Sequence, residues 1–190
     1  MGALVSTMVL ALAVVGLPRD LARMGCLPLP DDRSYLLTDT NRRVRGLTPR
    51  LADALAAGAW RSPTFLHLLR TLQSGDVIVQ MLDEPALDPT TAAQLSIIPV
   101  PGEVRFLRVR VGPGRSGDDL VALLGHELAH AVEIAREPQV RDSQSLRSLY
   151  TRIGFGLARH QQYDSHGAND LEQRIRHELE AFDECIVAAR

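Results

Sequence analysis

One apolar stretch, from Leu120 to Val132, constrains the fold of this 190-residue chain most because three ionisable side chains interrupt it. The stretch follows a loop rich in glycine and proline, and Asp118 or Asp119 can cap a helix at this point. We expect that helix to run from about Leu120 to Arg136 and to end before the next proline. Its apolar flanks predict burial along its length, so the ionisable side chains within it need a partner such as a metal ion.

The three side chains are His126, Glu127 and His130, in the order His-Glu-Leu-Ala-His. Residues four apart lie on one face of a helix, so the two imidazoles can reach a single zinc ion. Glu127 lies about 100° further round the helix. There it can take a proton from a zinc-bound water without being a ligand itself, and the hydroxide can attack a polarised carbonyl. The similar pair His177-Glu178 lacks a second histidine because Ala181 occupies that position, so we expect no second site.

The rest of the pattern predicts an α+β domain with a small antiparallel sheet. Thr48-Pro49 and Ser62-Pro63 each provide a helix start, and apolar residues at helical spacing follow the second of them. The expected strands are Val77–Leu82, Leu95–Val100 and Val104–Val111, and the expected C-terminal helices are Ser143–Tyr150 and roughly Asp164 or Ala168 to Ala189.

The sequence HELAH followed by Ala131-Val132-Glu133 resembles the active-site helix of the zincin metalloproteases. The resemblance implies a zinc-dependent peptidase fold with a small sheet packed beside that helix and further helices after it. Val132–Arg136 supplies neither the glycine nor the third histidine of the metzincins. The chain looks more like the gluzincin branch, whose third ligand is an acidic residue on a later helix. From about Ser62 to Leu179 it also resembles small exported bacterial proteins of unassigned activity.

The segment Tyr163–Ala168, which reads Tyr-Asp-Ser-His-Gly-Ala, best matches the later gluzincin motif. The resemblance makes Asp164 the third metal ligand, with Gly167 and Ala168 as the small residues that let two helices approach closely. Gluzincins favour glutamate at this position, and an aspartate is one methylene shorter.

Four other residues remain candidates for the third ligand: Glu172, Glu178, His160 and His166. Glu178 can instead pair with Arg174 on the surface. Glu133 can orient a ligand imidazole from behind or be a surface acid. Tyr150 and Tyr163 can donate to a substrate oxyanion or pack in the core.

Residues 1–30 are expected to form a signal-peptide-like or anchor segment with a linker, and residues 31–190 a single zincin-like domain. Met1–Leu17 is apolar apart from one serine and one threonine, which is the length of a signal-peptide core and short for a membrane span. The segment predicts a secreted or periplasmic protein, or one anchored to a membrane through its N-terminus. In an exported chain Cys26 and Cys185 could pair, and two unpaired thiols are the alternative.

Charge and composition argue against nucleic acid as a partner, because the net charge is −2 and aromatic residues make up only 4% of the chain. Our first hypothesis is an exported zinc peptidase that acts on a peptide or protein substrate. The alternatives are a zinc-stabilised scaffold or interaction module without turnover and, less directly, a metal-free membrane-surface protein. The sequence leaves the substrate and the oligomeric state open.

Overall fold

The computed structural model describes residues 42–155 and 164–188. The predicted N-terminal segment 1–30, Cys26, His160 and Tyr163 lie outside these residues. In the described ranges the chain forms an α+β fold, as expected from the sequence, and it contains one four-stranded sheet and one two-stranded pair. The strands are β1 (Val44–Gly46), β2 (Val77–Asp83), β3 (Ala93–Ile98), β4 (Arg105–Val111), β5 (Gly154–Phe155) and β6 (Asp164–Ser165). The helices are α3 (Pro49–Arg61), α4 (Pro63–Gln73), α5 (Gly117–Ala135), α6 (Ser143–Ile153) and α7 (His166–Ala188).

The sheet is mixed, which corrects the prediction of an antiparallel sheet. Its strand order is β1-β2-β4-β3, with β1, β2 and β4 parallel and β3 antiparallel to β4. Two helices, α3 and α4, connect β1 to β2 and allow the parallel pairing, because such a crossover returns the chain to the end of the sheet at which β1 began. Within this four-stranded sheet only β3 and β4 form the antiparallel pair that a short connection favours, and β3 lies at the edge of the sheet.

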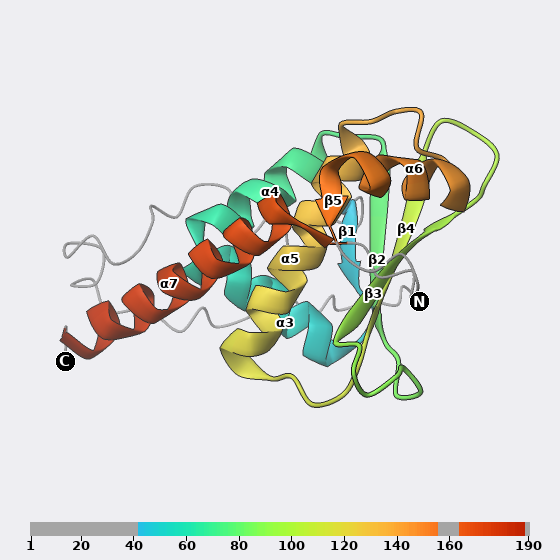
Figure 1. Ribbon diagram of the computed structural model, residues 1–190. Helices are drawn as coiled ribbons and strands as arrows, with labels where there is room; N and C mark the ends of the chain where they lie inside the picture. The colour runs from blue at the N-terminus through green and yellow to red at the C-terminus, as the bar shows by residue number, and fades with distance from the viewer. Residues whose placement is uncertain (1–41, 156–163, 189–190) are drawn as a thin grey trace, which may run out of the picture.

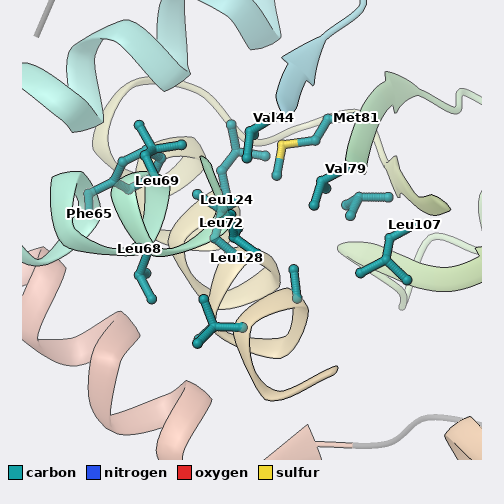
Figure 2. Close-up of a cluster of buried hydrophobic side chains, with 14 of the residues drawn as sticks. Val44, Phe65, Leu68, Leu69, Leu72, Val79, Met81, Leu107, Leu124 and Leu128 are labelled. Carbon is teal, nitrogen blue, oxygen red and sulfur yellow. The ribbon is translucent and has the colours of Figure 1, made fainter. Parts of the chain in front are cut away.

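The helix α5 lies between the sheet and α7, and it also contacts α3 and α4 (Figure 1). It begins at Gly117, after Ser116, so Asp118 and Asp119 lie in its first turn rather than capping it. Side chains of the sheet, α4 and α5 meet in one apolar core (Figure 2), whose labelled members include Val79, Met81, Leu107, Phe65, Leu72, Leu124 and Leu128. Burial of this apolar surface holds α5 against the sheet.

Gly125 lies in close contact with both α7 and α4. A Cβ atom at this position would lie 2.3 Å from Cδ1 of Ile175 on α7 and 3.3 Å from the ring of Phe65 on α4. The missing side chain therefore lets both neighbouring helices pack directly against the backbone of α5, one residue before His126.

No helix in the ranges 42–155 and 164–188 is both long enough and apolar enough to cross a membrane. Cys185 of α7 is disulfide-bonded. Its expected partner, Cys26, lies outside the described residues.

The C-terminal end of α5 is closed by Arg105, the first residue of β4. Its guanidinium donates to the carbonyl oxygens of Ile134, Ala135 and Glu137 at 2.8 to 3.1 Å. It also donates to the carboxylate of Asp76 at 2.7 and 2.8 Å. Only 3% of Arg105 is exposed, so these acceptors replace the water that a guanidinium and a helix end would otherwise require.

Replacing Arg105 with methionine should therefore lower the free energy of unfolding by about 3 kcal/mol, because buried carbonyls and Asp76 lose their donor. Chemical unfolding in urea measures the change. The matched control is Arg108→Met, because Arg108 is an exposed residue of the same strand. Equal unfolding free energies for the two variants would contradict the capping role of Arg105.

Candidate metal centre

Three elements bring the predicted site residues together. The helix α5 carries His126, Glu127 and His130, the strand β6 carries Asp164, and the first half of α7 carries Glu172. The pairing of β6 with β5 places Asp164 opposite Phe155, directly after α6. The site therefore depends on how α6 and α7 pack around α5.

His126, His130 and Asp164 form a group that could hold a metal ion. The Nε2 atoms of the two histidines are 3.0 Å apart, and Oδ1 of Asp164 lies 3.5 Å from the first and 3.8 Å from the second. Donor atoms in a tetrahedral zinc site are about 3.3 Å apart, so these three donors fit an ion of that size. Two imidazoles and one carboxylate are also a donor set that zinc and other transition metals accept.

Glu133 and Tyr150 hold the ring of His130 at its Nδ1 atom, on the side away from Nε2. Its Nδ1 lies 2.9 Å from Oε2 of Glu133 and 2.9 Å from the hydroxyl of Tyr150, which donates to the same carboxylate oxygen at 3.2 Å. Burial raises the pKa of Glu133, but hydrogen bonds from His130 and Ser165 outweigh it and leave this pKa below its ordinary value. An Nδ1–H that donates to the ionised carboxylate leaves the Nε2 lone pair free for a metal.

Ser165 connects this arrangement to the helix that follows Asp164. Its hydroxyl donates to Oε1 of Glu133 at 2.5 Å and accepts from the backbone N–H of Ala168 at 3.0 Å, in the first turn of α7. Only 2% of Ser165 is exposed. One buried hydroxyl thus caps α7 and fixes the carboxylate behind His130.

The ring of His126 faces a carboxylate on its other side. Its Nδ1 lies 3.1 Å from Oε2 of Glu172, although the angle falls short of a hydrogen bond. Glu172 also pairs with Arg176 at 2.8 Å, and Arg176 pairs with Asp119 of α5 at 2.6 Å. The contacts with His126 and Arg176 lower the pKa of Glu172 to about 2, against the effect of burial.

The electrostatic field at the site favours positive charge. Burial lowers the pKa of His126, but nearby Glu172, Glu127 and Asp164 outweigh it, so this pKa lies above its ordinary value. A cluster of carboxylates that raises the pKa of a buried imidazole also favours a cation between the ligands.

Glu127 is buried, with 6% of its surface exposed, and it lines the same cavity as the two histidines. Burial raises its pKa above the ordinary value of a glutamate, while His130 and His126 act in the opposite direction. A carboxylate with a raised pKa is better matched to accepting a proton near neutral pH than an exposed one.

A cavity of about 990 Å³ opens beside the metal group. Its walls come from β3, β4, β6, the β2–β3 and β4–α5 connections, α5, α6 and α7, and they include Glu84, Asp88, Gln94, Arg110, Arg115 and Arg176. Pockets for small ligands are about 300–1,000 Å³, so this cavity has room for several residues of a peptide.

The structure separates the candidates for the third ligand. Asp164 lies with the two Nε2 atoms, whereas Glu172 lies at the opposite nitrogen of His126. Glu178 contacts neither histidine. It accepts hydrogen bonds from the hydroxyl of Ser62 and from the N–H and hydroxyl of Thr64, at 2.5 to 3.0 Å. Glu178 therefore connects α7 to the start of α4 and does not form the expected surface pair with Arg174.

Of the remaining candidates, His166 and Tyr150 are among the described residues. His166 is the exposed first residue of α7, and His160 and Tyr163 lie outside the described residues. Tyr150 is buried, and its hydroxyl contacts the nitrogen of His130 that faces away from the donor cluster. Sequence reasoning did not identify Ser165 or Arg176. The position of Ser165, three residues before Ala168 at the start of a helix, was the signal that could have predicted its capping role.

Comparison with known proteins found no matching family model, no matching curated protein and no matching solved structure. The chemistry of the site therefore has to follow from its own residues.

The geometry predicts different effects for the two acidic candidates. Asp164→Asn should weaken zinc binding more than Glu172→Gln, because the first removes a charged donor and the second only an orienting carboxylate. In Glu172→Gln the zinc affinity should fall about 10- to 100-fold. Competition with a chromophoric zinc chelator measures both affinities.

Glu178→Gln is the control, since Glu178 caps another helix and should leave zinc affinity unchanged. A larger loss of zinc in Glu172→Gln than in Asp164→Asn would identify Glu172 as the ligand instead.

Proposed function

We propose that this protein is a zinc-dependent peptide-bond hydrolase of the gluzincin-like zincin type. The observation that carries the proposal is a three-donor metal group on the wall of a large cavity, with Glu127 beside it. Catalytic zinc sites keep three protein ligands and one open position, whereas structural sites are closed by four. The metal group formed by the described residues has three members.

Zinc, when bound, would polarise the scissile carbonyl and make a coordinated water acidic near neutral pH. His126, His130 and Asp164 would hold the ion. Glu127 would take the proton of the attacking water and return it to the leaving nitrogen. Glu133 and Tyr150 would keep the ring of His130 in place, and Glu172 the ring of His126.

We further propose that the chain acts outside the reducing cytoplasm, as a secreted, periplasmic or N-terminally anchored protein. The disulfide at Cys185 supports this location because disulfides persist in oxidising compartments. The apolar run at residues 1–17 is the sequence argument for it.

Replacing Glu127 with glutamine should lower the rate of peptide hydrolysis about 10²- to 10⁴-fold, because the general base is lost while the shape of the side chain is kept. Zinc content should stay at one equivalent. Hydrolysis of a mixed peptide library, followed by mass spectrometry, and elemental analysis measure the two quantities. Undiminished turnover in this variant would reject the mechanism, and an inactive wild-type chain that binds zinc would favour the scaffold alternative.

Replacing His130 with alanine should remove both zinc and activity, because two donors do not retain a catalytic ion. His177→Ala is the matched control. His177 begins the incomplete His-Glu pair on α7, and its side chain is 79% exposed. Full zinc occupancy in His130→Ala would refute the ligand assignment.

A further inference from the structure

Arg110 of β4 has an incomplete set of partners. It lines the cavity that also contains His126, Glu127 and His130. One terminal nitrogen, Nη2, donates to the amide oxygen of Gln94, its cross-strand neighbour on β3. Its Nε is buried and has no hydrogen-bond partner among the residues that the structure describes.

Arg176 also lines the cavity, but it pairs with Glu172 and Asp119. Arg115, on the same cavity wall, is exposed. No carboxylate in the described ranges forms an ion pair with Arg110, whose one side-chain partner is a neutral amide.

Apart from the acidic residues of the metal site, Glu84 and Asp88 line the cavity with Arg110, and each accepts hydrogen bonds within its own loop. Glu84 accepts from the backbone N–H of Ala86 at 3.3 Å. Asp88 accepts from the backbone N–H of Thr90 at 2.8 Å and from the hydroxyl of Thr90 at 2.5 Å. Neither carboxylate is a hydrogen-bond partner of the Arg110 guanidinium.

A buried Nε–H without an acceptor is costly, and a carboxylate matches the fork of guanidinium donors with two parallel hydrogen bonds. The open part of the cavity is where such an anion can enter.

We propose that Arg110 binds a carboxylate of the peptide substrate, either an acidic side chain or the C-terminus, within the groove that leads to the metal group. The inference rests on the proposed hydrolase function and adds a substrate class to it. Arg110 would then determine specificity while taking no part in the bond cleavage.

The test uses the zinc-loaded full chain and four peptide hydroxamates of equal length. The hydroxamate binds the metal, and the other end carries glutamate or glutamine with a free or an amidated C-terminus. Isothermal titration gives the dissociation constants for the wild type, Arg110→Gln and Arg108→Gln. Arg108 is the matched control because it lies two residues away on the same strand and is exposed.

For the wild type we expect the probes with a carboxylate to bind about tenfold or more tightly than the doubly neutral probe. The two singly charged probes distinguish a side-chain carboxylate from a C-terminal one. The preference should disappear in Arg110→Gln and persist in Arg108→Gln. The melting temperature of Arg110→Gln should be equal to or higher than that of the wild type, since a purely structural arginine would lower it.

Equal affinity of the wild type for all four probes would overturn the role of Arg110 while leaving the metal site intact. Binding of none of them would overturn the proposed hydrolase and this inference together. A carboxylate preference that survives in Arg110→Gln would assign the recognition to another cation of the cavity, such as Arg115, and refute the proposal.

Discussion

The close approach of α7 to α5 is the constraint on which the candidate site depends. Gly125 allows it, because any side chain there would meet Ile175 of α7. With the helices in contact, β6, which leads directly into α7, brings Asp164 to the two histidines and Ser165 to Glu133. The next turns carry Glu172 to the other side of His126. Apolar packing between two helices thus decides where Asp164 and Glu172 lie relative to the histidines.

The two histidines are supported in similar ways from opposite sides. Glu133 lies behind Nδ1 of His130, and Glu172 lies beside Nδ1 of His126. With both Nδ1 atoms facing carboxylates, the two Nε2 atoms face each other and Asp164. A buried ionisable cluster is stable only when its charges are matched, so the same carboxylates that satisfy the rings also direct them toward a cation.

Local signals in the sequence predicted the parts of this protein that local physics controls. The helix of His126 and His130 follows from residue spacing, and Ser62-Pro63 does begin a helix whose first turn the serine caps. Asp164 came from a resemblance, and the structure places it with the histidines. The parallel pairing of β1, β2 and β4 was missed because alternation reports burial and not direction. The roles of Glu178 and Arg105 were missed because each acts on a residue far away in the sequence.

Arg105 has a thermodynamic consequence for the site. One guanidinium joins the first residue of β4, the end of α5 and the residue before β2, so separation of α5 from the sheet would break these buried hydrogen bonds. A ligand that binds only to the intact α5 then stabilises the whole domain. Each tenfold increase of that ligand above its dissociation constant adds about 1.4 kcal/mol to the unfolding free energy. The melting temperature of the chain should accordingly rise with metal occupancy and report it.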